Sequence, residues 1–111
     1  MHIGLQDIRT GISVPGQLPA TVMNFSRWGA CLILPKITLG EHHVFYLTLN
    51  NDDCALLLYP REEVAEEELA PISARSIWMN SCEDRQQPAF IIGIQFLHDQ
   101  KKLYKLLKKR T

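Results

Sequence analysis

The feature that most constrains the fold is a succession of short apolar runs separated by turn residues. Each run is rich in β-branched, aromatic or aliphatic side chains and is short for a helix. The spacing is close to the ~8–12 residues typical of sandwiches and barrels. We therefore expect strands over 20–25, 30–34, 43–49, 54–59, 72–79 and 90–96.

Two of these runs alternate with a period of two, as a half-buried strand requires. The segments 43–49 and 54–59 are separated by Asn50–Asp53, whose side chains favour a tight turn, so they are expected to pair as a hairpin. The sequence thus predicts a mostly β chain, folded as a small six-stranded antiparallel β-barrel. The apolar faces expected to point inward are Phe45, Leu47 and Leu49 in the first run, and Phe90, Ile92, Ile94 and Phe96 in the second.

Three segments depart from the strand pattern. Residues 1–19 contain Gly11, Pro15, Gly16 and Pro19 and are expected to be a flexible loop and edge strand. Residues 61–70 have the composition of a charged connector or a short helical turn. Residues 98–111 place Leu103, Leu106 and Leu107 at helical spacing among lysines, which predicts a C-terminal amphipathic helix.

Length and charge limit the classes of function. A chain of 111 residues is expected to form one domain, residues 1–111. Its net charge of zero disfavours a nucleic-acid binder that relies on bulk positive charge. The charge is unevenly distributed, with −7 over 41–70 and +5 over 98–111. Such blocks of opposite sign favour docking to a protein partner or association into a homo-oligomer.

The cysteines and the apolar runs bear on localisation. The three cysteines are an odd number without a CxxC pair, which favours reduced thiols in the cytoplasm. The longest apolar stretch is far shorter than the ~18 residues of a membrane span, so no membrane insertion is expected.

No motif of an enzyme is present in the sequence. The chain lacks G-x-S-x-G, HExxH and P-loop patterns, so catalytic residues are not expected. His42 and His43 have no recognised metal-ligand spacing with a cysteine, and neither a metal nor a cofactor is expected. We predict a binding protein rather than an enzyme.

The most informative segment is the predicted strand–turn–strand over 22–35. Asn24 and Ser26 can fold back on the local backbone, and Gly29 can adopt a positive φ that turns the chain into the next strand. The same polar groups can also bind a ligand at the rim of a barrel. The residues alone leave both interpretations open.

This segment resembles a known family. NFSRWGACL (24–32) is similar to the D/NxSxxG signature of PilZ domains, small cytoplasmic β-barrels of the split-barrel type that bind the second messenger cyclic di-GMP. ARSIWM (74–79) and FIIGIQFL (90–97) resemble two later strands of that family, in the same order. The resemblance covers roughly residues 9–110. It implies cyclic di-GMP as ligand, no cofactor and no catalysis.

The resemblance also implies an arginine motif, RxxxR, that grips the ligand. Arg9 matches the second arginine, whereas Leu5 stands at the position of the first. A leucine cannot replace the bidentate contacts of a guanidinium with a phosphate or a guanine. Arg27 and Arg75 are candidates to replace the missing arginine in part, although strand alternation would place Arg75 and Trp78 on opposite faces unless a bulge intervenes.

The remaining ligand-binding residues implied by the resemblance lie in the signature and the later strand. Asn24 and Ser26 would hydrogen-bond the ligand, Gly29 would allow close backbone approach, and Arg27 would contribute a cation. Trp78 would stack on a guanine, or else pack at the barrel rim.

Two functions follow from these observations. In the first, the chain is a cyclic di-GMP receptor, and the ligand orders residues 1–19 as a switch that presents a surface to a downstream protein partner. In the second, the chain is a degenerate PilZ domain that binds no nucleotide and acts as a protein–protein interaction module, as the missing first arginine favours. Nucleic-acid binding through the lysine-rich helix is disfavoured because no aromatic residues are interleaved for stacking.

Overall fold

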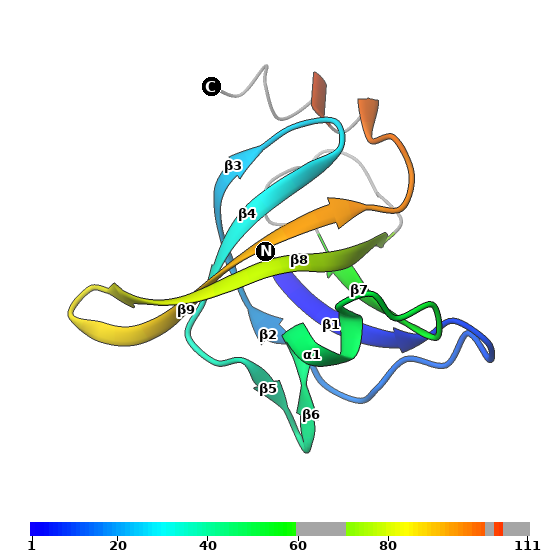
Figure 1. Cartoon of the computed structure of the whole chain (residues 1–111), viewed down its shortest axis with the longest axis horizontal. Coiled ribbons are helices and arrows are strands. Elements are labelled where there is room, and N and C mark those ends of the chain that lie inside the picture. The colour runs from blue at the N-terminus through cyan, green and yellow to red at the C-terminus, as the bar shows by residue number, and fades with distance from the viewer. Residues whose placement is uncertain (60–70, 102–103, 106–111) are drawn as a thin grey trace.

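The computed structural model describes residues 1–59, 71–101 and 104–105. Its main feature is one antiparallel sheet of seven strands in the order β2-β1-β7-β8-β9-β4-β3 (Figure 1). The prediction of a mostly β, antiparallel chain is confirmed. The strands are β1 (His2–Asp7), β2 (Leu18–Pro19), β3 (Thr21–Phe25), β4 (Gly29–Leu34), β7 (Cys54–Tyr59), β8 (Ile72–Asp84) and β9 (Gln87–Phe96), and a separate pair is formed by β5 (Thr38–Leu39) and β6 (His42–His43).

The predicted six-stranded barrel requires two corrections. The sheet has seven strands, because residues 2–7 and 18–19 form two strands beyond the six predicted runs, while the run 43–49 contributes no strand to this sheet. In addition, the two edge strands, β2 and β3, are consecutive in sequence with only Ala20 between them, but no pairing joins them among the described strands. The chain itself connects the two edges of the sheet through Ala20, but no ladder of hydrogen bonds closes the sheet into a barrel.

Strand β1 lies inside the sheet, between β2 and β7. Ile3 and Leu5 have no exposed surface and belong to the core. The expectation of a loop and edge strand over 1–19 is therefore wrong for residues 2–7, since the glycines and prolines that suggested it begin only at Gly11. That these residues form a ligand-driven switch stays a prediction.

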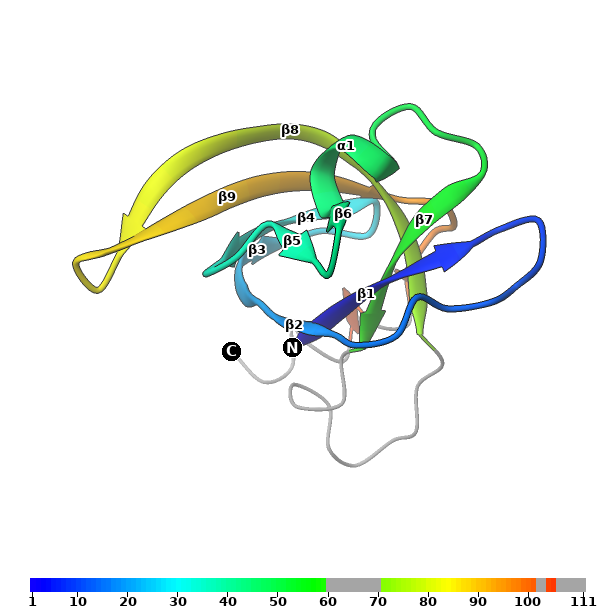
Figure 2. The same cartoon turned by 90° about the horizontal axis from the view of Figure 1, so that it is seen from below.

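The run 43–49 is a helix rather than a strand. Helix α1 (Val44–Thr48) packs between β7 and β8 and replaces the predicted hairpin (Figure 2). His43 caps its first turn, because its Nδ1 accepts a hydrogen bond from the backbone N–H of Tyr46 at 3.2 Å. Thr48 is fully buried, and its hydroxyl lies 2.6 Å from that of Ser76 on β8. Contacts with the sheet thus override a strand-like local pattern.

The alternation predicted for 90–96 is confirmed. Ile92, Ile94 and Phe96 are buried in the core, Phe90 packs partly against it, and Gln95 on the opposite face is exposed. Strands β8 and β9 form a long curved hairpin that projects beyond the rest of the sheet (Figures 1 and 2). The hairpin turns at Arg85–Gln86, where both φ angles are positive, as in a type I′ turn.

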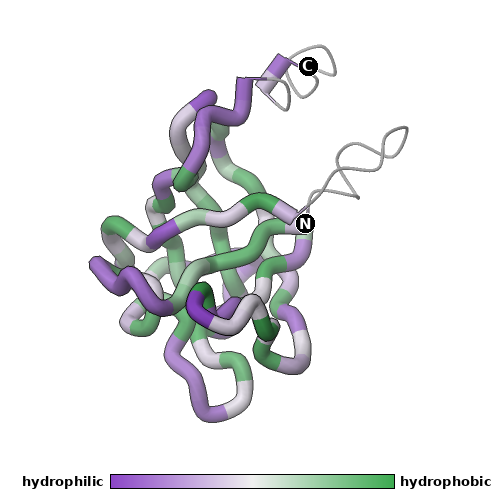
Figure 3. Tube along the Cα trace, turned by 90° about the vertical axis from the view of Figure 1, so that its right-hand side faces the viewer, coloured by the Kyte–Doolittle hydropathy of each residue, from purple (hydrophilic) through white to green (hydrophobic). Residues whose placement is uncertain are grey.

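Two predictions fall wholly or partly outside the described residues. The charged connector over 61–70 lies outside them, as do 102–103 and 106–111 of the predicted C-terminal helix. In the described part of 98–111, the backbone N–H of Tyr104 donates to the carbonyl of Gln100 at 2.8 Å. The described residues after β9, 98–101 and 104–105, are mostly hydrophilic, in contrast to the apolar strands (Figure 3). Over the described ranges, none of the helices has the length and apolar character to cross a membrane.

Candidate functional site

The turn between β3 and β4 is built by Ser26. Its Oγ accepts hydrogen bonds from the backbone N–H groups of Trp28 and Gly29, both at 3.2 Å. The hydroxyl donates to the carbonyl of Gly29 at 3.3 Å, and the backbone N–H of Ser26 donates to the same carbonyl at 2.9 Å. Ser26 therefore folds back on its own backbone and builds the turn.

Gly29 has a structural role that differs from the expected one. Its φ is not positive, so it does not turn the chain through the left-handed region. A Cβ added at Gly29 would overlap the backbone carbonyl oxygen of Ile94 on the neighbouring strand β9. A glycine is required at this position because β4 and β9 approach closely.

Arg27 extends from this turn to the segment after β9. Its Nε donates to Asp99 Oδ1 at 3.2 Å, and Nη2 donates to Oδ2 of the same carboxylate. This hydrogen bond and the favourable charge interaction raise the pKa of Arg27 and lower the pKa of Asp99. The guanidinium also lies 5.4 Å from the centre of the Trp28 ring. The side chain of Arg27 remains 41% exposed, so a ligand has access to it.

Asn24 and Trp78 lie on one row across four strands. Asn24 pairs with Cys31, Cys31 with Gly93, and Gly93 with Trp78. Directly opposed residues of an antiparallel sheet point to the same face. The row therefore presents an amide at one end and an indole at the other, with a glycine between them. At ~4.8 Å per strand it spans roughly 14 Å, the scale of a dinucleotide.

This row belongs to the outer face of the sheet. In the adjacent row, Leu32 and Ile92 have no exposed surface and face the core. Trp78 is 42% exposed, and its indole lies over Gly93, where an added Cβ would overlap the ring. Gly93 thus allows the tryptophan to lie flat against the sheet.

A β-bulge places Arg75 and Trp78 on the same face, which strict alternation alone would not do. The pairing of β8 with β9 shifts between Ser76 and Trp78, which leaves Ile77 as the extra residue. Arg75 pairs with Gln95, and Trp78 pairs with Gly93. Gln95 and Gly93 are two residues apart on β9 and therefore point to the same side, so Arg75 and Trp78 share the outer face. A second bulge at Met23 in β3 keeps Asn24 on that face.

Arg9 lies in the turn between β1 and β2, away from this face. The turn is capped by Asp7, whose Oδ1 accepts from the backbone N–H of Arg9 at 2.9 Å. The Arg9 Nε is 3.5 Å from Asp53 Oδ1, and both side chains are mostly exposed. In Figure 1 this turn lies at one end of the molecule and the β3–β4 turn at another. The structure brings Asn24, Trp78 and Gly29 together on neighbouring outer rows but does not bring Arg9 to them.

The outer face also exposes apolar side chains that the sequence did not single out. Met23 is 55% exposed and Ile77 51%, and both are the extra residues of the two bulges. Trp28 beside the turn is exposed as well. The sequence allowed Arg75 to share this face with Trp78 only if a bulge intervened, and no glycine or proline marks the bulge in β8.

Two cavities lie elsewhere on the molecule. One of about 540 Å³ separates the tip of the β8–β9 hairpin, at Arg85, from Met1 and Pro19. Another of about 210 Å³ lies beside Ile8 and Arg75. Asn24, Ser26 and Trp78 line neither of these two cavities, whereas Arg75 lines the second.

The three cysteines are free thiols. Burial raises the pKa of the Cys31 thiol, and the proximity of Cys82 raises it further. Burial also raises the pKa of Cys54, with a further contribution from Asp7. In the part of the chain that the structure describes, no group of three or more His, Cys, Asp or Glu side chains is arranged to hold a metal ion.

The fold is a small antiparallel β structure whose outer face carries aromatic and polar side chains. Neither a family model, nor a curated protein, nor a solved structure matches the chain. A function can therefore be inferred only from the residues of this face.

Proposed function

We propose that the chain is a PilZ-type receptor domain for cyclic di-GMP and that the ligand binds on the outer face of β3, β4, β9 and β8. The observation that carries the proposal is the row that joins Asn24 to Trp78, with Arg75 on the same face. An indole lying flat over a glycine offers a stacking surface for a guanine. The amide of Asn24 offers a donor and an acceptor to the ligand.

In this proposal Arg75 supplies the cation that the sequence assigned to Arg9. A guanidinium forms paired hydrogen bonds with a phosphate or with the O6/N7 edge of guanine. Arg75 is exposed and is separated from Trp78 only by Ser76 and the bulge residue Ile77. Ligand binding involves no catalysis and no cofactor, and the bound state is relayed to a protein partner.

Isothermal titration calorimetry with cyclic di-GMP tests the proposal. We expect Trp78→Ala to weaken binding roughly five- to a hundredfold, the effect of one lost base–aromatic stack. Arg75→Ala should weaken it about tenfold or more, because a charge-assisted contact is lost. Arg9→Ala is the matched control and should leave the affinity unchanged. Absence of heat with the folded wild-type domain would overturn the proposal.

A second function is favoured by the position of Arg9. Arg9 is paired with Asp53 at a distant turn, Arg27 is paired with Asp99, and the outer face exposes Met23 and Ile77. An apolar face with few free cations suits a protein partner that docks without nucleotide. In that case the wild-type domain gives no heat with cyclic di-GMP, and it keeps its fold after Trp78→Ala.

A further inference from the structure

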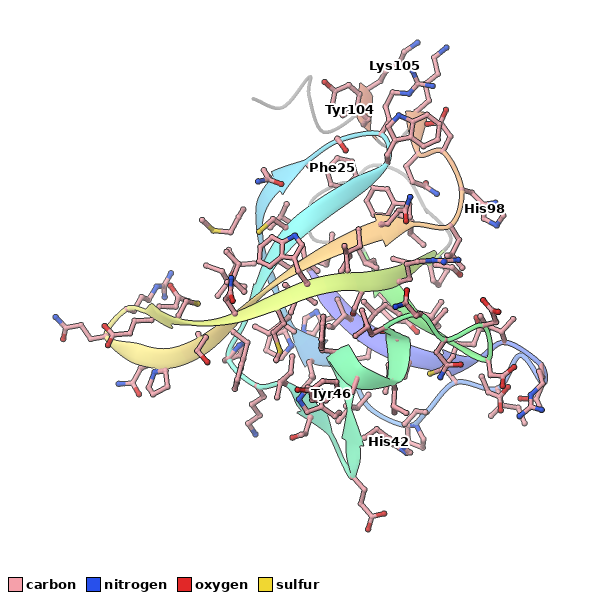
Figure 4. The ribbon with its side chains drawn as sticks, in the orientation of Figure 1. Phe25, His42, Tyr46, His98, Tyr104 and Lys105 are labelled. Carbon is pink, nitrogen blue, oxygen red and sulfur yellow. The ribbon has the colours of Figure 1, made fainter. Side chains whose placement is uncertain are left out.

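The segment that follows β9 is fastened to the β3–β4 turn. The backbone N–H of Phe96 donates to the carbonyl of Trp28 at 2.7 Å, and that of Gln100 donates to the carbonyl of Arg27 at 2.9 Å. The two hydrogen bonds from Arg27 to Asp99 lie between these backbone contacts in sequence. Figure 4 shows Tyr104 at the same end of the molecule as Phe25, which precedes the turn. Two adjacent turn residues thus hold residues 96–100.

Arg27 is the one member of this contact that an anionic ligand would also bind. Its Nε and Nη2 both donate to Asp99, so the Asp99 carboxylate already occupies this edge of the guanidinium. A phosphate that takes the same edge must displace the carboxylate, because both need the paired N–H groups in one plane. The Arg27 side chain is partly exposed and lies three residues from Asn24.

We propose that the Arg27–Asp99 pair is a switch that couples the ligand face to the segment 97–101: an anionic ligand takes Arg27 from Asp99 and releases this segment from the turn. The inference rests on the proposed function, because it assigns the regulation of the same face. It also identifies the segment 97–101 as the part of the chain through which ligand binding reaches a protein partner. The surface uncovered on binding comprises Asp99, Gln100 and the carbonyl of Arg27.

Thermodynamic linkage fixes the direction in which the Arg27–Asp99 pair and the ligand affect each other. If the ligand and Asp99 compete for Arg27, then weakening the pair raises ligand affinity, and bound ligand weakens the contact of Gln100 with the turn by the same factor. Exposed ion pairs are weak, so the coupling is expected to be small. Because the Arg27–Asp99 pair is weak, a ligand needs only a small difference in affinity between the two states to open it.

Asp99→Asn tests the switch, with Asp53→Asn as the matched control. Asp53 pairs with Arg9 in a similar exposed ion pair at the other turn, so its loss changes charge equally but leaves Arg27 untouched. Amide hydrogen exchange measured by NMR follows Gln100 and Phe96, and calorimetry gives the affinity for cyclic di-GMP. We expect Asp99→Asn to speed exchange at Gln100 and to raise affinity roughly two- to fivefold. Asp53→Asn should change neither quantity.

The outcomes separate this inference from the proposed function. In the wild-type protein, cyclic di-GMP should speed exchange at Gln100 in the same direction as Asp99→Asn. If the ligand binds but Asp99→Asn changes neither its affinity nor exchange at Gln100, the switch is wrong and the proposed function stands. If no variant binds cyclic di-GMP, the proposed function fails, and opening by this ligand fails with it.

Discussion

The two turns that carry Arg9 and Arg27 are built from the same chemistry but face different surroundings. In each, a side-chain oxygen accepts hydrogen bonds from the turn backbone, Asp7 in the first and Ser26 in the second. In each, the arginine pairs with an aspartate from a distant segment. The β3–β4 turn adjoins the outer face, whereas the β1–β2 turn lies at the start of β7. Local chemistry therefore makes a turn, and its position in the sheet decides whether it can serve a site.

The largest effect is expected for Leu5→Arg, which places an arginine at the position that the RxxxR pattern would require. Leu5 is fully buried in β1, so the substitution puts an unpaired charge into the core. We expect the free energy of unfolding to fall by about 3–5 kcal/mol, which is enough to unfold a marginal domain. Chemical denaturation measures it. A stable Leu5→Arg protein that binds cyclic di-GMP more tightly would show that the β1–β2 region belongs to the site.

A smaller effect is expected from alanine at the glycine of each turn. Gly29→Ala forces a Cβ against the carbonyl oxygen of Ile94, and the backbone of β9 cannot move aside without loss of pairing. We expect a loss of about 2–4 kcal/mol. Gly11→Ala meets no atom but must adopt a φ of +74°, which costs about 1–2 kcal/mol. Thermal unfolding measures the loss of stability in each variant. An equal loss in the two variants would contradict the close approach of β4 and β9.

The smallest effect is expected from acid pH on the contact between Arg27 and Asp99. The hydrogen bond from Arg27 lowers the pKa of Asp99, and the charges of Arg27 and Lys101 lower it further, while burial opposes the shift. A lowered pKa means that the ionised carboxylate stabilises the folded contact. This contribution is present above the ordinary pKa of ~4 and is lost as the pH falls through the lowered value. The protection factor of the Gln100 amide, which is its exchange rate corrected for the intrinsic pH dependence, should therefore fall below pH ~4 in the wild-type protein but not in Asp99→Asn. A flat pH profile in the wild type would argue against the pair.

The sequence predicted some elements well because their signals are local. The alternation over 90–96 located β9 and its buried face, and the polar residues of 24–29 located the turn between β3 and β4. The helix α1 was missed because an apolar run of five to seven residues fits either a strand or a buried helix. The hydrogen bond of Thr48 with Ser76 that accompanies the helix joins residues far apart in sequence.

The candidate site could be predicted only in part. Asn24, Ser26, Gly29 and Trp78 were singled out by residue type, and their role in binding stays a prediction. A shared face for Arg75 and Trp78 required a bulge, and nothing local marks its place at Ile77. The contact of Arg27 with Asp99 could not be foreseen, since it joins residues separated by 72 positions.

The sequence by itself determined that this chain is mostly β, where its polar turn lies and which face of β9 is buried. These properties depend on residue type and periodicity over a few neighbouring positions. The tertiary structure decided that Leu5 belongs to the core, that two bulges place Asn24, Arg75 and Trp78 on one outer face, and that Arg9 lies at another turn. These properties depend on strand order and register, which arise from packing between residues distant in the chain.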